Sequence, residues 1–266
     1  MKKKAGVAYI PGDSVIHRLD PRTKLLIMIS VSLTAFLVSG VFLMLPVFLT
    51  VLLLVFLSGN PAGWVSSMKL ILPLLIFIVF IELLFCPEDP GRIIYSVNLG
   101  PLNAVLSEGS ISYSLLLGLR VLSVTGISFL FVLTTKYSDF VKSLQLMKFP
   151  PIISFSLGYA LRATTTLSAD TRAIMDAQRS RGLEFDRNSL FKNRNKLLSL
   201  FIPMTVTVLN RSSQVSDAMQ CRGYGGGSSV SIYNPPSFGR NDFIIAVIVV
   251  FTEIILINLS YYEVLR

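Results

Sequence analysis

The sequence predicts an all-α integral membrane protein with about five transmembrane helices and two long cytoplasmic helices. Three observations predict this class. First, 52% of the 266 residues are hydrophobic and the mean hydropathy is +0.66, which is more apolar than a soluble domain of this length. Second, apolar runs of helical length recur along the chain. Third, lysine and arginine are concentrated in only some of the segments that separate those runs.

Four regions follow one another along the chain. Residues 1–24 form a polar and basic leader, 25–135 contain four transmembrane helices, 136–240 form a basic region with two long helices, and 241–266 contain the last transmembrane helix. The expected spans, in chain order, are Leu25–Ser39, Val41–Leu57, Leu70–Phe85, Tyr113–Thr134 and Phe243–Leu259.

Two connections between the spans are predicted to be irregular. The polar stretch Ser58–Gly63 is expected to break the second helix and to start a short polar loop, because it contains Asn-Pro and two glycines. A longer loop is expected from Cys86 to about Ser112, where prolines and glycines are frequent.

The distribution of cations predicts the orientation. Of the 24 lysines and arginines, all but three lie in the leader, around Lys69, or between Lys136 and Arg240. The exceptions are Arg92, Arg120 and Arg266. Because cytoplasmic segments of membrane proteins are enriched in lysine and arginine, we expect the N-terminus and the basic region to be cytoplasmic.

Three charged residues fall inside predicted spans, namely Glu82, Arg120 and Glu253. A lone charge at mid-bilayer costs several kcal/mol, so each is expected to face protein or water, or to have a partner. Glu82 and Arg120 have two interpretations: a substrate or proton path, or a structural role in which they pair with each other or snorkel. The structural role is favoured, because no second acidic residue lies nearby to form a relay.

The basic region begins with a short surface helix and continues with two long helices. The short helix is expected over Lys136–Pro150, with Ser138 as its N-cap. The long helices are expected over about Ser154–Arg181 and Lys196–Arg222, with a kink at Pro203 in the second. At roughly 1.5 Å per residue the first would be about 40 Å long, an arm along the membrane surface.

A heptapeptide pattern, Asp-Ala-x-x-x-Arg-Gly, ends both long helices, as residues 176–182 and 217–223. Arginine in a last helical turn meets the negative end of the helix dipole, and glycine after it can adopt a left-handed conformation. One copy would be an ordinary helix cap. Two copies, each with alanine four residues before arginine on the same face, suggest two equivalent docking points on a two-part partner.

Several kinds of chemistry have no candidate site in the sequence. It contains no phosphate-binding loop, no Gly-x-Ser-x-Gly elbow, no His-Glu-x-x-His motif and no pair of clustered carboxylates. His17 is the single histidine, and Cys86 and Cys221 are far apart, so neither a metal site nor a disulfide is suggested. We therefore expect no cofactor, no catalytic site and, without basic residues interleaved with aromatic ones, no nucleic-acid partner.

The chain resembles the transmembrane T component (EcfT) of energy-coupling factor transporters, the CbiQ/EcfT-like family, over nearly its whole length. The resemblance rests on Tyr9-x-Pro-Gly-x-Ser-x-x-His-Arg-Leu-Asp-Pro-Arg-Thr-Lys24, on Thr134-Thr135 with Asp139, and on the two Arg-Gly helix ends. The family usually has alanine before each Arg-Gly, where this chain has Ser180 and Cys221, and often has proline near Thr165. The two replacements remain small.

The resemblance implies a non-catalytic subunit of an ATP-driven importer for vitamins or transition-metal ions in a prokaryotic plasma membrane. Its partners would be the lipid bilayer, two ATP-binding cassette (ABC) ATPase subunits of the EcfA type, which hydrolyse ATP, and a membrane-embedded S component, which binds the substrate. Arg181 and Arg222 would insert into grooves of the two ATPases. The implied docking residues are Ala177, Ser180, Arg181, Gly182, Ala218, Cys221, Arg222 and Gly223.

Two other classes of function remain open at this point. A stand-alone membrane transporter, channel or membrane enzyme would use Arg120 and Glu82, and it would retain activity when the ATPases are removed. The second class is a purely structural membrane scaffold. ATP-dependent uptake that is lost when Arg181 and Arg222 are replaced would exclude it.

Overall fold

The computed structural model describes residues 9–85, 93–99, 102–147, 149–183, 194–224 and 238–264. The chain divides into two compact units, which we describe separately. The first unit is Met1–Met147 with Pro235–Arg266, and the second unit is Lys148–Asn234.

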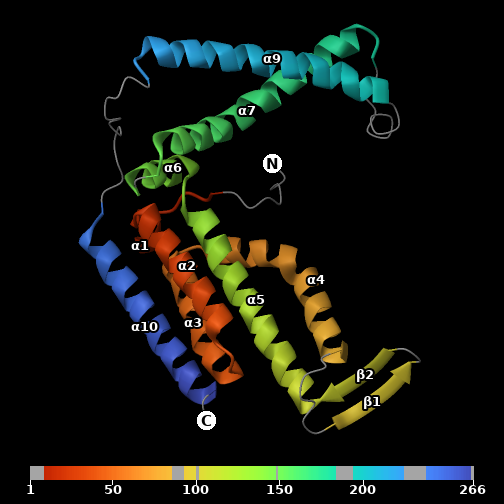
Figure 1. The fold of residues 1–266 in the computed structure, drawn as a ribbon, viewed down its shortest axis with the longest axis vertical. Helices are drawn as coiled ribbons and strands as arrows, with labels where there is room; N and C mark the ends of the chain where they lie inside the picture. Colours follow the sequence, from red (N-terminus) through yellow and green to blue (C-terminus); the bar gives the residue numbers. More distant parts are fainter. Residues whose placement is uncertain are drawn as a thin grey trace. The chain divides into compact units, whose positions relative to one another are not determined.

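The first unit is a bundle of helices in which α2, α3, α5 and α10 run side by side (Figure 1). Its helices are α1 (Val15–Arg18), α2 (Pro21–Leu37), α3 (Val41–Leu57), α4 (Pro61–Phe85), α5 (Glu108–Thr134), α6 (Tyr137–Leu146) and α10 (Arg240–Val264). Helix α5 is central, because it contacts α2, α3 and α4, while α10 packs against α2 and α3.

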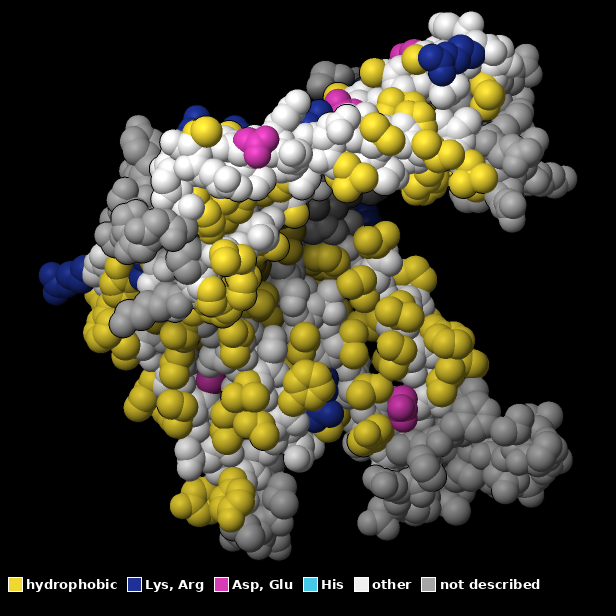
Figure 2. All heavy atoms as spheres, turned by 45° about the horizontal axis from the view of Figure 1, so that its top comes forward, with side chains coloured by type: hydrophobic (Ala, Val, Ile, Leu, Met, Phe, Trp, Pro, Cys, Tyr) yellow, Lys and Arg dark blue, Asp and Glu magenta, His cyan; other side chains and the backbone are white. Residues whose placement is uncertain are grey.

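Three helices of this unit are long and apolar enough to cross a membrane: Pro61–Leu83, Gly109–Thr134 and Arg240–Tyr262. Helix α3 is a shorter apolar helix, and α2 has the same length of 17 residues. Each expected span coincides with most or all of one of these five helices, and Figure 2 shows hydrophobic side chains covering much of the outer surface of the bundle. The predicted class, an all-α integral membrane protein, is confirmed.

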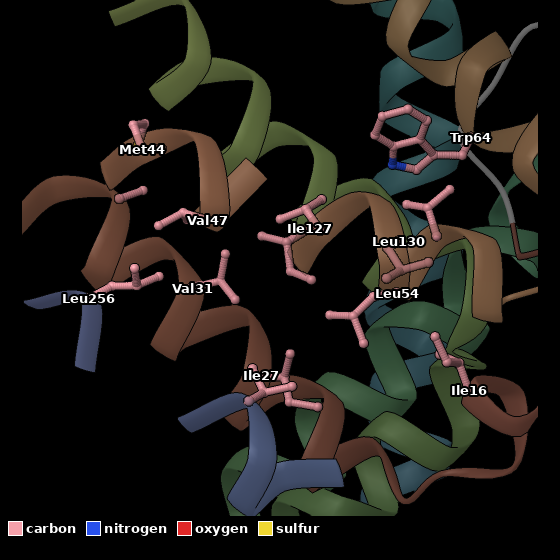
Figure 3. Packing of buried hydrophobic residues seen from close by; sticks show 14 of the residues in the cluster. Ile16, Ile27, Val31, Met44, Val47, Leu54, Trp64, Ile127, Leu130 and Leu256 are labelled. Carbon is pink, nitrogen blue, oxygen red and sulfur yellow. The ribbon is translucent and has the colours of Figure 1, made fainter. Parts of the chain in front are cut away.

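The core of the bundle lies where α2, α3 and α5 meet. Its residues point toward one another in Figure 3, and include Ile27, Val31, Met44, Val47, Leu54, Ile127 and Leu130. Trp64 of α4 closes one end, where its indole N–H donates to the carbonyl of Gly126 at 2.9 Å. A Cβ atom on Gly126 would lie 3.0 Å from the Trp64 ring, so the absence of a side chain permits this close packing.

The predicted break between the second and third spans is only partly correct. Gly59 has a left-handed φ of +72° and ends the helical path, but α4 begins already at Pro61 instead of after a polar loop. Proline suits the first position of a helix, and the side chain of Asn60 accepts a hydrogen bond from the N–H of Gly63 at 3.2 Å, as an N-cap does. Helix α4 then changes direction along its length (Figure 1), in keeping with Pro73 in its interior.

The region expected as a loop between α4 and α5 contains a β-hairpin. Strands β1 (Ile93–Leu99) and β2 (Leu102–Ser107) are antiparallel, with Leu99 opposite Leu102. The run Ile-Ile-Tyr-Ser-Val at the start of β1 is rich in β-branched and aromatic residues, which favour strands. The prolines and glycines at 87, 90 and 91 that suggested a loop lie outside the described residues.

The short helix after the fourth span is present as α6, but its predicted N-cap is wrong. The N-cap is Lys136, without a side-chain cap bond, and Ser138 lies inside the first turn with its hydroxyl 3.3 Å from Asp139. Helix α6 packs against α2 and belongs to the first unit.

The second unit consists of two long helices, α7 (Pro151–Ser180) and α9 (Arg194–Cys221), which cross each other (Figure 1). Pro151 occupies the first turn of α7, where its missing N–H has no intrahelical partner to lose. Pro203 lies inside α9 as predicted. Most of the expected connection between the helices and the Gly-rich segment after α9 lie outside the described residues.

Candidate functional site

The first copy of the repeated heptapeptide ends α7 in a complete Schellman motif. Arg181 is the C-cap residue, and Gly182 follows it with a φ of +87°. The N–H of Gly182 donates to the carbonyl of Arg179 at 2.9 Å, and the N–H of Leu183 donates to the carbonyl of Gln178 at 3.1 Å. These two bonds satisfy carbonyls that the end of a helix would leave unpaired. We call Arg181 with Gly182 the first tip.

The second copy ends α9 in the same way. Gly223 has a φ of +73°, and its N–H donates to the carbonyl of Gln220 at 2.9 Å. The N–H of Tyr224 donates to the carbonyl of Met219 at 3.0 Å. Each bond joins residues with the same spacing as in the first copy, so the two heptapeptides have the same local fold. We call Arg222 with Gly223 the second tip.

Both glycines are required by the backbone and not by the space around them. A Cβ atom at either position would meet nothing within 4 Å. Residues with side chains rarely adopt a positive φ, whereas glycine does so without steric cost. The glycine therefore ends each helix sharply and leaves the preceding arginine as its last side chain.

The predicted docking residues are all solvent-exposed in this structure: Ala177, Ser180, Arg181, Gly182, Ala218, Cys221, Arg222 and Gly223. Within the described residues, the guanidinium groups of Arg181 and Arg222 have no hydrogen bond or ion pair. The copies differ at their three middle positions, and one of these differences changes a contact: Asp176 pairs with Arg179 at 3.4 Å, whereas the second copy has Gln220 in place of that arginine.

Three polar contacts hold the two long helices where they cross. Arg211 of α9 pairs with Asp170 of α7 at 2.8 Å. The hydroxyl of Thr171 lies 3.8 Å from the sulfur of Met204, and the amide of Gln178 donates to the carbonyl of Ser199 at 3.2 Å. The sequence reasoning missed this ion pair, since no local pattern joins residues so far apart in the chain.

The two tips lie at opposite ends of α7. Tyr224, directly after the second tip, packs against Phe155 near the start of α7 with ring centroids 5.9 Å apart. The first tip lies at the other end of that helix. At roughly 1.5 Å per residue, the path along α7 from Phe155 to Arg181 is about 40 Å. The second unit therefore presents two similar arginines with a wide separation.

The charges within the predicted spans have structural surroundings. Arg120 of α5 donates from Nε to the carbonyl of Ala35 at 2.7 Å and from Nη2 to the carbonyl of Val38 at 2.8 Å. Arg120 thus supplies hydrogen-bond donors to two carbonyls at the C-terminal end of α2, which the helix itself leaves without a partner. The suggested pair of Arg120 with Glu82 is wrong, since no such contact is present among the described residues, where Glu82 is half-buried.

Glu253 of α10 is 1% exposed and accepts a hydrogen bond from the hydroxyl of Thr50 at 3.3 Å. This contact joins α10 to α3. In the described part of the chain, no group of three or more histidine, cysteine or acidic residues is arranged to hold a metal ion.

The fold and the tips define a helical integral membrane protein whose second unit presents two matching arginine ends. Comparison with known proteins agrees with this class. The family model CbiQ, described as "Cobalt transport protein", matches residues 12–232. The chain belongs to this family.

Curated relatives cover almost the whole chain. The energy-coupling factor transporter transmembrane protein EcfT of Streptococcus equi subsp. equi is 31% identical over 261 residues, which is 95% of each chain. EcfT of Lactococcus lactis subsp. cremoris is 30% identical over 258 residues, 94% of this chain and 95% of the relative. EcfT of Heliobacterium modesticaldum is 30% identical over 249 residues, 91% of each chain.

Proposed function

We propose that this chain is the energy-coupling subunit of an ECF-type ABC importer for vitamins or transition-metal ions. In this function it transmits the motion of two ABC ATPase subunits to a substrate-binding S component. The observation that supports the proposal most directly is the pair of tips, which have the same cap and expose guanidinium groups that no described residue pairs with. The name that the relatives share, energy-coupling factor transporter transmembrane protein, also supports it.

Each tip is suited to enter a groove on an ATPase. Arginine has five N–H donors in a planar fork, which can form charge-assisted hydrogen bonds with carboxylates or with backbone carbonyls. Ala177 and Ala218 lie one turn before the arginines, so a partner backbone can approach closely. Ser180 and Cys221, although they are not alanine, are small enough to allow the same approach.

Movement at the tips would reach the membrane through the long helices. Helices α7 and α9 contact each other through the Asp170–Arg211 pair and the two other polar contacts described above. They would therefore move together as two crossed rigid helices, which we call the arms. Both arms also expose large apolar side chains that an S component could contact, including Ile152, Ile153, Leu157, Leu198, Phe201 and Ile202. The chain itself would be non-catalytic, and ATP hydrolysis would occur on its partners.

The proposed location is the prokaryotic plasma membrane, with the leader and both arms on the cytoplasmic side. The support is the distribution of lysine and arginine: all but three of the 24 lie in the leader, around Lys69 or between Lys136 and Arg240, and such cations favour the cytoplasmic side. The tips would then face the compartment that contains ATP.

The test is the double charge reversal Arg181→Glu with Arg222→Glu. We expect the variant to remain in the membrane fraction and the yield of co-purified ATPase to fall at least tenfold, because each tip would then repel an acidic or carbonyl-lined groove. Arg172→Gln, which replaces an exposed arginine of α7 away from both tips, is the matched control and should retain the ATPases. Undiminished co-purification with the double variant would refute the docking role.

The alternative of a stand-alone transporter, channel or enzyme that uses Arg120 and Glu82 gains no support from the geometry. Arg120 is engaged by two carbonyls of α2, and it has no acidic partner among the described residues.

A further inference from the structure

The chain passes between the two units at two places. It leaves the first unit after Met147, the residue that follows α6, and it returns at Pro235, shortly before α10 begins at Arg240. We call the end of α5 with α6 the first root, and the start of α10 the second root. In Figure 1 both roots lie at the end of the bundle where α2 begins. The covalent path from the arms to the membrane helices runs through these two roots.

Hydrogen bonds from the leader hold the end of α5 at the first root. The N–H of Ile10 donates to the carbonyl of Leu133 at 3.0 Å, and Nζ of Lys24 donates to the carbonyl of Thr134 at 2.9 Å. Carbonyls in the last turn of a helix have no partner within the helix, and a cation there also interacts favourably with the helix dipole. Lys24 is 7% exposed and Thr134 is 4% exposed, so water competes little for their bond.

His17 completes a closed ring of hydrogen bonds at this end of α5. Its Nε2–H donates to the carbonyl of Ile10 at 3.1 Å, and its own carbonyl accepts from Nζ of Lys24 at 3.3 Å. The path from Lys24 through His17 and Ile10 therefore returns to Leu133, which is next to Thr134 in the chain. The ring ties the end of α5 both to the leader and to α2.

A single carboxylate holds the second root. Oδ2 of Asp242 accepts at 2.7 Å from the N–H of Gly239, which directly precedes α10, as an acidic residue in the first turn does in a capping box. Oδ1 of the same side chain accepts at 2.6 Å from the N–H of Asp20, the N-cap residue of α2. Asp242 is 3% exposed, so it joins the beginnings of two helices inside the protein.

Charge connects both roots to Lys24. Burial lowers the pKa of Lys24 to about 8, although Asp139, Asp242 and Asp20 act in the opposite direction. At pH 7 the amine is therefore still mostly protonated. The three carboxylates belong to the first turn of α6, the first turn of α10 and the N-cap of α2. Both roots and α2 thus interact favourably with one buried cation.

Ordinary helix capping does not account for these contacts. A cap satisfies a helix end with residues that are close to it in the chain. Here Lys24 reaches Thr134 across 110 positions, and Asp20 reaches Asp242 across 222 positions. Asp242 caps α10 with one oxygen and uses the other to hold the leader. The leader is therefore the element that the two roots share.

We propose that the leader holds both roots as one rigid block while the ATPases move the arms. This inference rests on the function proposed above. The residues responsible, which we call the leader anchor, are Ile10, His17, Asp20, Lys24 and Asp242. They are positioning residues, because they act through the roots and not at the tips. Helix ends open more easily than helix interiors, so without the anchor the roots would open locally and absorb the movement of the arms.

The test measures the distance between the two roots in the complex with the ATPases. Spin labels are placed on Met147→Cys and Phe243→Cys, which replace an exposed residue at each root, in a chain that also carries Cys86→Ser and Cys221→Ser. The chain is purified with its ATPases, and pulsed electron paramagnetic resonance compares the nucleotide-free complex with the complex trapped by ATP and vanadate. We expect a narrow distribution of distances whose width is the same in both states.

Two variants weaken the anchor, one at each root. Lys24→Met removes the donor to Thr134 and His17, and Asp242→Asn leaves one acceptor oxygen for two N–H groups. Both substitutions nearly preserve the size of the side chain. We expect both variants to retain the ATPases and to give a distribution about twofold wider in the trapped complex only. Lys24→Arg keeps the charge and the donors, and a pocket beside Lys24 leaves room for it, so it should keep the distribution narrow.

Ser260→Ala is the matched control. Ser260 accepts from the N–H of Ser39 at 3.2 Å, so it joins the opposite end of α10 to the residues after α2, and its loss should leave the distance between the roots unchanged. Equal widths in the unmodified chain and in both variants would overturn the proposal, and so would widening of the unmodified chain when the complex is trapped.

Two further results would also be decisive. If the variants were wider even without nucleotide, or if Lys24→Arg behaved like Lys24→Met, the anchor residues would only stabilise the fold and the proposal would be wrong. Failure of the unmodified labelled chain to retain the ATPases is a different result, which would contradict the docking function on which the inference rests.

Discussion

Gly182 and Gly223 show how single residues shape the candidate site. Their φ values of +87° and +73° reverse the chain directly after each arginine, and the space around both is open. Conformation alone therefore requires glycine. The strain of another residue depends on how well it tolerates the left-handed region, which asparagine does and valine does not.

This difference gives a prediction for the first tip. Gly182→Val should raise the free energy of the capped conformation by about 1–3 kcal/mol, and Gly182→Asn should raise it by much less. The N–H of Leu183 bonds to the carbonyl of Gln178, so its amide hydrogen exchange should be faster in the valine variant. Each 1.4 kcal/mol of destabilisation of the cap corresponds to about a tenfold increase in the exchange rate. The second tip serves as an internal control, and equal exchange in the two variants would contradict the argument.

At the scale of elements, the crossing of α7 and α9 determines how far apart the tips lie. The Asp170–Arg211 pair is partly buried, with side chains 25% and 33% exposed, so it contributes roughly 1 kcal/mol or less. Even so, it is the one ion pair between the long helices within the described residues, and it joins the faces of α7 and α9 that meet.

We predict that Asp170→Arg or Arg211→Asp alone broadens the distribution of distances between the tips. The exchange of both residues should restore it, because opposite charges face each other again. Pulsed electron paramagnetic resonance between labels on Cys221 and on an introduced cysteine, Ser180→Cys, measures the distribution in a Cys86→Ser background. A distribution that stays narrow in both single variants would show that apolar packing alone sets the crossing.

At the scale of the whole molecule, the uneven distribution of cations predicts the sidedness of the chain. Cys221 is exposed beside the second tip, and Ser39 is exposed between α2 and α3, at the end of α2 opposite the leader. If the arms are cytoplasmic, these two positions lie on different sides of the membrane.

In the Cys86→Ser variant, a membrane-impermeant maleimide should label Cys221 in inside-out vesicles at least tenfold more than in intact cells. Ser39→Cys, in a background that also contains Cys221→Ser, should show the opposite pattern. Labelling after detergent solubilisation controls for the reactivity of each thiol. Strong labelling of Cys221 in intact cells would place the tips outside and would end the docking proposal.

The sequence by itself determined the features that depend on local pattern. Apolar runs indicated the spanning helices, and the Asp-Ala-x-x-x-Arg-Gly repeat located both tips, because a Schellman cap is built from six consecutive residues. The bounds of α7 and α9 were also close to those expected. The start of α4 was missed because Pro61 was interpreted as a helix breaker, whereas after Asn60 it is a first helical residue.

Only the tertiary structure decided which distant residues meet. Arg120 satisfies carbonyls of α2, Arg211 pairs with Asp170, and the N–H of Asp20 bonds to Asp242. A pocket likewise forms only where two stretches that are far apart in the chain, residues 9–24 and 134–139, come together. Such contacts join residues from different helices, and their partners are set by how the helices pack, which no local spacing along a chain encodes.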